Sequence, residues 1–357
     1  MSPAILASTS PASHPVLVSS ASSGLAAALH WLAEEQSPDG SYGESFPPYT
    51  AAAAYALWLN DTHSSKAASA YAWLAAQLNN STNWFWGGYG EFDIPGVSLY
   101  SLAFSSNLQL VHVSSVASSF LDFQQSNGGF LGFWPNGASN PVTSSVDTAE
   151  ALRGLVSARA INASSQQLAV SYLIGLQNSD GSFNLTDTQP YALDYSQGPE
   201  PVSMTALVLL ALRDASYTDA NNHVAKALNF LTDVSSKYSL IANDSNAVYS
   251  ASLSALALYG FGRTGDANDA IAFILSHQNS DGGFRDSTRS SSGSNALDTA
   301  WASIALQQVI PGRALSSFLP EVLILGIIAG IVALAVIVGL VVYLVQRNKT
   351  QTQVKSL

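Results

Sequence analysis

The sequence predicts an all-α protein in which six consecutive pairs of helices are followed by one membrane-spanning helix. Three observations predict this fold. A short turn motif recurs along the chain, an apolar segment of helical length stands on each side of every copy, and residues 322–346 contain no charged side chain. A stretch of about twenty apolar residues is long enough to cross a bilayer as a helix.

The turn motif has the form Gln-x-x-Asp-Gly-x-aromatic, and four copies are recognisable. They are QSPDGSY at 36–42, QQSNGGF at 124–130, QNSDGSF at 177–183 and QNSDGGF at 278–284. Apolar helical runs precede them at 25–33, 116–123, 168–176 and 270–277, and others follow at 51–59, 148–156, 204–212 and 298–306. A turn signal alone would not keep the glutamine, the aromatic residue and both helices in the same order.

Two weaker helix pairs fill the gaps between these copies. One joins residues 67–77 to 99–108, and the other joins residues 224–231 to 248–259. The resulting period of about 40–55 residues lies in the range of helical repeat architectures. The sequence therefore predicts six helix pairs.

The chemistry of the turn residues suggests structural roles. The glycines can adopt a positive φ and reverse the chain after a helix, and the aspartates can accept hydrogen bonds from nearby backbone N–H groups. We expect the aromatic residue to be buried and the glutamine amide to bridge to a helix end. The residues in these roles are Gly128, Gly181, Gly282, Asp39, Asp180, Asp281, Phe130, Phe183, Phe284, Gln36, Gln125, Gln177 and Gln278.

The last copy of the motif carries a specific resemblance. The segments QNSDGGF at 278–284 and DTAWA at 298–302 resemble the repeat of the prenyltransferase and squalene–hopene cyclase superfamily. Phe or Tyr stands here in place of the tryptophan of that family's Gln–Trp motif. The resemblance covers residues 21–310. It implies a terpenoid cyclase-like α6/α6 toroid, in which six inner helices are ringed by six outer helices around a central cavity.

The chain lacks the residues that carry the known chemistry of this superfamily. It has no Asp-x-Asp-Asp proton donor and no cysteine for a prenyltransferase zinc site or a thioester. Squalene–hopene cyclases also have a second helical barrel, whereas this sequence predicts a single one. The six histidines are scattered, and no two have the spacing of metal ligands on one helix face. We therefore expect no cofactor and no metal. The sequence favours a protein that is not an enzyme.

Three acidic residues remain as candidate catalytic groups. Asp147 and Asp298 open inner helices in matching Asp-Thr-Ala contexts, so both are expected at the cavity mouth, and Glu91 lies in an aromatic loop. A carboxylate pair there could perform acid–base chemistry or bind a cation. The alternative is that Asp147 and Asp298 are helix N-caps. Glu150, three residues after Asp147, gives the spacing of a capping box.

Aromatic residues gather in two of the long loops. The candidate ligand-binding residues are Trp84, Trp86, Tyr89, Phe133 and Trp134. Aromatic faces suit sugars, isoprenoids and cations, although loop aromatics also fold over barrel ends. Loops within the helix pairs are long and loops between pairs are short, so the long loops are expected to share one rim. This rim and the central cavity are the expected site for a glycan, a peptide or a small hydrophobic molecule.

The chain is expected to have five parts. They are a flexible Ser-, Ala- and Pro-rich segment at 1–20, the toroid at 21–310, a linker at 311–320, a transmembrane helix at 321–346 and a basic tail at 347–357. The positive charges of the tail predict a cytoplasmic C-terminus and an extracellular toroid. This is a single-pass cell-membrane protein of type I or signal-anchored topology. Gly326 and Gly330 have a GxxxG spacing that can pair two spans into a homodimer and that is also common by chance.

The surface composition bears on the partners. The net charge of −11 argues against a nucleic-acid partner, because phosphates require Lys and Arg. Glycosylation motifs of the form Asn-x-Ser/Thr begin at Asn60, Asn79, Asn80, Asn162, Asn184 and Asn243, all before the predicted span. They suggest a cell-surface glycoprotein, although Ser and Thr are frequent enough for chance to explain about half of them.

The sequence thus favours a membrane-anchored toroid, displayed outside the cell, that binds or interacts without catalysis. The first alternative is an enzyme resembling the terpenoid cyclases, prenyltransferases or lyases, with carboxylates in its cavity as acid and base. The second alternative is a structural protein of the cell envelope.

Overall fold

The computed structural model describes residues 15–80, 85–86, 89–90, 93–133, 142–187, 201–219, 221–235, 247–285 and 293–310. The chain divides after Ala314 into two units, and every described residue belongs to the first. The predicted linker beyond Ile310, the transmembrane helix, its Gly326 and Gly330, and the basic tail all lie outside the described residues.

The described part contains twelve α-helices, which alternate between two roles. The outer helices are α1 (Pro15–Glu35), α3 (Ser65–Leu78), α5 (Val113–Leu121), α7 (Ala163–Gly175), α9 (His223–Ser235) and α12 (Thr264–Ser276). The inner helices are α2 (Pro47–Asn60), α4 (Asp93–Phe104), α6 (Ser145–Ser157), α8 (Pro201–Asp214), α11 (Ala247–Gly260) and α13 (Ala296–Val309). Short elements add the 3₁₀ turn η2 (Leu108–Leu110) and the strands β1 (Phe85–Trp86), β2 (Tyr89–Gly90), β3 (Phe130–Phe133) and β4 (Val142–Ser144). Strand β1 pairs with β2, and β3 pairs with β4, both antiparallel.

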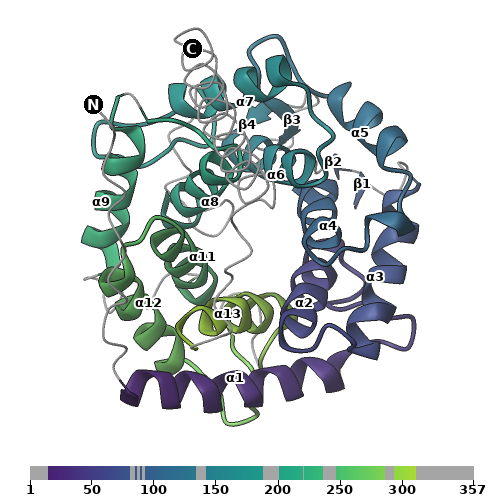
Figure 1. Cartoon of the computed structure of the whole chain (residues 1–357), viewed down its shortest axis with the longest axis vertical. Coiled ribbons are helices and arrows are strands. Elements are labelled where there is room, and N and C mark those ends of the chain that lie inside the picture. The colour runs from purple at the N-terminus through teal and green to yellow at the C-terminus, as the bar shows by residue number, and fades with distance from the viewer. Residues whose placement is uncertain are drawn as a thin grey trace, which may run out of the picture. The chain divides into compact units, whose positions relative to one another are not determined.

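The inner helices contact one another in a closed cycle. Each of α2, α4, α6, α8 and α11 packs against the next, and α13 packs against both α11 and α2. Figure 1 shows this cycle with the outer helices around it. The last and first pairs are also joined directly, because α1 packs along α13. The predicted helical ring architecture is therefore present in the described residues.

Burial separates the two kinds of helix. Every residue of α8 from Val202 to Leu212 is buried, and so is every residue of α13 from Ala296 to Gln307. The outer helix α5 buries only Val116, Ala117 and Phe120. A helix surrounded by other elements is apolar on all sides, whereas a surface helix carries one apolar stripe. The inner ring is thus covered both by the outer helices and by neighbouring inner helices.

The repeated turns fold as their residues predict. Gly181 has a φ of 98°, and the N–H of Phe183 donates to the Thr205 hydroxyl of the next inner helix at 3.3 Å. The Asp180 carboxylate accepts from the Ser182 N–H at 3.0 Å. The other copies repeat the bond from the aromatic residue, with pairs Tyr42–Thr50, Phe130–Thr148 and Phe284–Thr299. All four aromatic residues are fully buried, so the predicted roles of glycine, aspartate and aromatic residue are confirmed.

The glutamine of each turn links its own repeat to the next outer helix. The Gln177 amide donates to the carbonyls of Gly181 and of His223 at the start of α9. Equivalent pairs of bonds join Gln36 to Gly40 and Lys66, Gln124 to Gly128 and Ser165, and Gln278 to Gly282 and Gly24. The bond from Gln278 to Gly24 spans 254 residues of sequence and closes the ring.

The second turn corrects one prediction. Gln125 was expected to bridge, but Gln124 does so, and Gln125 donates only to the Phe123 carbonyl at 3.2 Å. The bridging glutamine stands three residues before the Asp or Asn of the turn, and Gln124 has that spacing to Asn127.

This pair of adjacent glutamines offers a matched test. We expect Gln124→Ala to lower the free energy of unfolding by about 1–3 kcal/mol, because two partly buried carbonyls lose their donor. Gln125→Ala should cost about 0.5–1.5 kcal/mol or less, since only one bond to a neighbouring residue is lost. Urea unfolding of the full-length variants followed by circular dichroism measures both. Equal losses would contradict the assigned roles.

A different residue makes the link in the weaker second repeat. The Asn79 amide nitrogen donates to the Leu110 carbonyl at 3.0 Å, and its oxygen accepts from the His112 N–H at 2.8 Å. These bonds connect the end of α3 to the segment just before α5. Asn79 therefore performs the task that glutamine performs elsewhere, which the sequence motif could not indicate.

The N-terminal boundary differs from the prediction. Helix α1 begins at Pro15, so residues 15–20 are helical, although they were expected to be part of a flexible segment. Within the described residues, α1 is also the one helix with the length and hydropathy of a membrane span, and about a third of its most apolar window is buried. Core helices and N-terminal signal sequences share these properties, so the finding indicates no topology.

Candidate functional site

Asp147 lies in the first turn of α6, at the end of the ring where the inner helices begin. Its N–H donates to the Ser144 hydroxyl at 3.0 Å, and that hydroxyl donates back to the Asp147 carboxylate. Ser144 is the N-cap, and Asp147 stands three residues later, at the spacing of a capping box, but the carboxylate bonds to the Ser144 hydroxyl. The carboxylate also abuts Gly132 of β3, where a Cβ would lie 2.0 Å from Oδ1. Asp147 is 5% exposed.

Asp298 occupies the same place at the start of α13. Asn295 is the N-cap; its carbonyl oxygen accepts from the Asp298 N–H at 2.9 Å, and its amide donates to the Asp298 carboxylate. Asp298 is fully buried. The expected N-cap residue was therefore three positions too late in both helices. The motifs Ser144-x-x-Asp147 and Asn295-x-x-Asp298 were visible in the sequence and are the correct capping signal.

The ring holds these two carboxylates apart. Helix α6 lies between α4 and α8, and α13 lies between α11 and α2, so the two helices stand on opposite sides of the inner cycle. Each aspartate occupies the same position in its own repeat. It stands one residue before the threonine that accepts the hydrogen bond from the N–H of the buried aromatic residue. The corresponding positions in the other two strong repeats hold Tyr49 and Met204. Asp147 and Asp298 are thus related by repeat position and are not a converging pair.

The remaining predicted site residues fall mostly outside the described residues. Glu91, Trp84 and Trp134 lie there entirely, and for Trp86, Tyr89 and Phe133 the structure describes the backbone alone. The backbone nevertheless brings two aromatic segments together. Strand β2, which contains Tyr89, contacts β3, which ends at Phe133. The two predicted aromatic loops therefore meet beside the start of α6.

A buried ionic cluster, which was not predicted from the sequence, occupies the other end of the inner helices. Arg153 of α6 donates from Nε to the Asp214 carboxylate of α8 at 3.0 Å, and its Nη1 lies 3.6 Å from Glu150 Oε2. Its guanidinium carbon lies 4.0 Å from the centre of the Tyr100 ring of α4. Arg213 donates to the other oxygen of Asp214 at 2.7 Å. We call Glu150, Arg153, Arg213, Asp214 and Tyr100 the Arg153 cluster.

Electrostatics hold the Arg153 guanidinium in its charged form. Burial disfavours the charge, but Tyr100, Glu150 and Asp214 outweigh that effect and raise the pKa of Arg153 above its usual value. Buried arginines are rare unless they are paired. A signal was present in the sequence, because Glu150 and Arg153 interrupt an apolar helical run at a spacing of three residues. The side chains of the Arg153 cluster join α4, α6 and α8, and each acid of the cluster lies close to a guanidinium.

Tyr100 gives a pH dependence that can be measured. Burial raises the pKa of Tyr100 to about 12, with an opposing effect from Arg153. A raised tyrosine pKa stabilises the fold fully below the ordinary value near 10, and this contribution is lost as the pH rises to about 12. Two pKa units correspond to about 2.7 kcal/mol. Between pH 10 and 12, the free energy of unfolding should therefore fall less steeply with pH in Tyr100→Phe than in the wild type, as measured by urea unfolding followed by circular dichroism. An unchanged slope would contradict the assignment.

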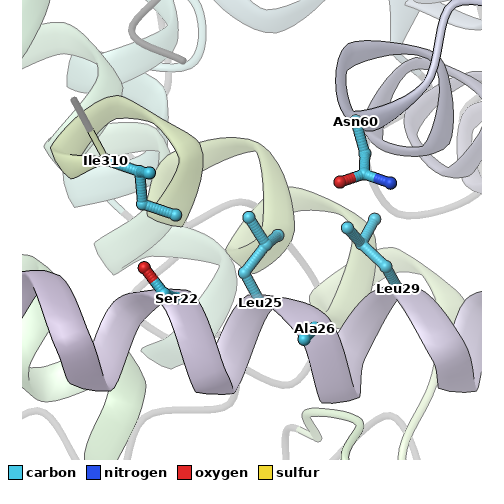
Figure 2. Close-up of a pocket in the computed structure, with 6 residues that line it drawn as sticks. All are labelled: Ser22, Leu25, Ala26, Leu29, Asn60 and Ile310. Carbon is cyan, nitrogen blue, oxygen red and sulfur yellow. The ribbon is translucent and has the colours of Figure 1, made fainter. Parts of the chain in front are cut away.

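A separate pocket of about 210 Å³ lies at the seam between the first and last helix pairs. In Figure 2, Leu25 and Leu29 rise from α1 towards Ile310 and Asn60, which stand just beyond α13 and at the end of α2. The lining residues are Ser22, Leu25, Ala26, Leu29, Asn60 and Ile310. None of the predicted site residues lines this pocket. Among the described residues, no group of three or more His, Asp or Glu side chains could hold a metal ion.

Comparisons with known proteins bear on the fold. The family model of the A-macroglobulin TED domain matches residues 105–266, which is less than half of the chain. That stretch, like the whole chain, contains no cysteine. A comparison with curated proteins gives no significant match.

Several solved structures share the fold. The type II terpene cyclase MstE from Scytonema is 15% identical, with a TM-score of 0.58 over 81% of this chain and 98% of the cyclase chain. A variant of that cyclase with bound geranylgeranyl dihydroxybenzoate is 14% identical, with a TM-score of 0.56 over 83% and 99% of the two chains. A protein from Actinoplanes is also 14% identical, with a TM-score of 0.57 over 81% and 99%. The chain therefore has the fold of the terpenoid cyclase-like toroids, as its turn motifs implied.

Proposed function

We propose that this chain is a membrane-anchored α6/α6 toroid displayed outside the cell, which binds a glycan, a peptide or a small hydrophobic molecule without transforming it. The observation that carries the proposal is the placement of Asp147 and Asp298. Both carboxylates are bonded to their own N-cap residues at opposite sides of the inner cycle. Acid–base catalysis by a carboxylate pair requires both groups within reach of one substrate.

The rest of the inner ring supports a binding role. At the end opposite to Asp147 and Asp298, the Arg153 cluster links α4, α6 and α8, and its charges are paired with one another. The aromatic loops around β1, β2 and β3 meet at the end where the inner helices begin. Aromatic side chains at such a rim provide a broad apolar contact for a sugar face or an apolar group.

Binding arrays can test this proposal with the full-length protein. We expect the purified chain to bind members of an oligosaccharide, peptide or polyprenyl-alcohol array, and Trp84→Ala with Trp134→Ala to weaken that binding at least tenfold. A tenfold loss corresponds to about 1.4 kcal/mol, within the range of a buried aromatic contact. Asp147→Asn and Asp298→Asn should leave binding within about twofold. Loss of binding in the aspartate variants, with folding intact, would contradict the proposal.

A terpenoid cyclase-like enzyme is the second candidate, and two observations favour it. The fully buried Asp298 shares α13 with Trp301, whose ring packs edge-on against Tyr249 of α11 at 6.2 Å. A buried carboxyl group near aromatic rings suits proton donation to an apolar substrate. The structures that share this fold include type II terpene cyclases. On this alternative, Asp298 would act as a single acid on a linear polyprenyl substrate.

A further inference from the structure

Three glycosylation motifs can be followed through all three residues in the described part of the chain. They begin at Asn60, Asn162 and Asn184. The three residues of the motif at Asn162, from Asn162 to Ser164, are all exposed. The motif at Asn184 is the opposite case, because Leu185 and Thr186 are buried and Asn184 is half-buried. The side chain of Asn60 lines the seam pocket.

The two polar side-chain atoms of Asn162 have different roles. Asn162 is the N-cap of α7, and its carbonyl oxygen accepts from the Ser165 N–H at 2.9 Å. The bond uses the oxygen, so the exposed amide nitrogen Nδ2 is left to react. Because an N-glycosidic amide keeps its carbonyl oxygen, a sugar on Nδ2 is compatible with the cap.

We propose that Asn162 is a site of N-linked glycosylation on the folded toroid and that Asn184, whose motif is largely buried, is not. This inference rests on the proposed display of the toroid outside the cell. In the transfer, Nδ2 loses a proton and forms a bond to the anomeric carbon of a glycosyl diphosphate donor. The bond from that carbon to the diphosphate oxygen breaks, and the diphosphate leaves with the electron pair of that bond and takes up the proton. No oxidation or reduction occurs.

The glycan would have a defined place on the ring. Asn162 follows the end of α6 and precedes α7, in one of the short loops between helix pairs. Inner and outer helices alternate along the chain, so we expect the inner helices to be parallel to one another and the C-terminal ends of α6 and α13 to share one face. Carbohydrate on Asn162 would therefore coat the face at which α13 ends, and would leave the rim of long loops open for a ligand.

The test uses the full-length protein expressed in a host whose secretory pathway performs N-glycosylation. Peptide mass spectrometry should find the Asn162 peptide heavier by one glycan, and the Asn184 peptide unmodified at that residue. Asn162→Ser should lose the glycan while it keeps the helix cap, because serine is also a good N-cap. Ser164→Ala should lose it while Asn162 remains in place. Asn184→Gln should leave the modification of Asn162 unchanged.

Protease treatment of intact cells separates this inference from the proposed function. If protease reaches the toroid from outside but the Asn162 peptide is unmodified, the glycosylation proposal is wrong and the display stands. If glycan is found on Asn184, or persists at residue 162 in Ser164→Ala, the structural selection of the site is wrong. If protease does not reach the toroid, the display and the glycosylation inference both fail.

Discussion

Replacement of Arg153 by methionine is expected to lower the free energy of unfolding by about 3–5 kcal/mol, the cost of breaking a buried ion pair on one side. The substitution leaves the Glu150 and Asp214 carboxylates in the protein interior without the guanidinium that lies 3.6 Å and 3.0 Å from them. Arg213 remains beside Asp214 but cannot replace the contact with Glu150, because it extends from α8 towards Gly260 of α11. Urea unfolding of the full chain, followed by tryptophan fluorescence, measures the loss.

Arg263 provides the control for this experiment. It forms an ion pair with Asp266 at 2.7 Å, but its side chain is 37% exposed. Exposed pairs typically contribute about 0.2–1 kcal/mol. We therefore expect Arg263→Met to stay within about 1 kcal/mol of wild type. If both substitutions had the same small effect, the Arg153 cluster would not join α4, α6 and α8 as described.

Replacement of Gly181 by alanine is the second change with a large expected effect. Gly181 has a φ of 98°, and a Cβ there would lie 2.3 Å from the Lys226 carbonyl oxygen of α9. A left-handed conformation costs a non-glycine residue about 1–2 kcal/mol, and the contact with backbone cannot be relieved by a rotamer change. We expect a total loss of about 2–4 kcal/mol, measured by thermal and urea unfolding of the full chain.

Gly175 is the matched control for the glycine substitution. It lies in the last turn of α7, six residues before Gly181, and a Cβ there would meet nothing within 4 Å. Alanine is a better helix former than glycine by about 0.8–1.0 kcal/mol. Gly175→Ala should therefore be neutral or stabilising. A similar loss at both positions would show that close packing of the turn against α9 is not what requires glycine at residue 181.

The turns could be predicted from the sequence because their chemistry is local. The positive φ of the glycine, the bond to the aspartate and the bond from the aromatic N–H to the helix that follows all lie within one repeat, so periodicity and spacing were enough. The prediction named Gln125, but the bridging residue is Gln124, which has the spacing of three residues to Asn127 that the other turns share.

Interactions between distant helices could not be predicted in the same way. The bonds of Arg153 to Asp214 and of Gln278 to Gly24 join residues that only the closed ring brings together. Asn79 links two outer helices without the turn motif. Its side chain, shorter than that of glutamine, bonds to Leu110 at the end of η2 and to His112 just before α5. The N-caps were placed three residues too late because helical periodicity does not locate helix ends that closely. The motifs Ser144-x-x-Asp147 and Asn295-x-x-Asp298 carried the local signal for both boundaries.

Incubation with linear polyprenyl substrates tests the central claim most directly. The full-length wild-type protein, Asp147→Asn and Asp298→Asn would each be incubated with polyprenyl alcohols and a geranylgeranyl-substituted aromatic acid, and the extracts analysed by mass spectrometry and chromatography. Because the two carboxylates are bonded within their own helix turns on opposite sides of the ring, we predict no new cyclic product in any sample. A cyclic product formed by the wild type and lost in Asp298→Asn would contradict the binding account and identify this toroid as an enzyme.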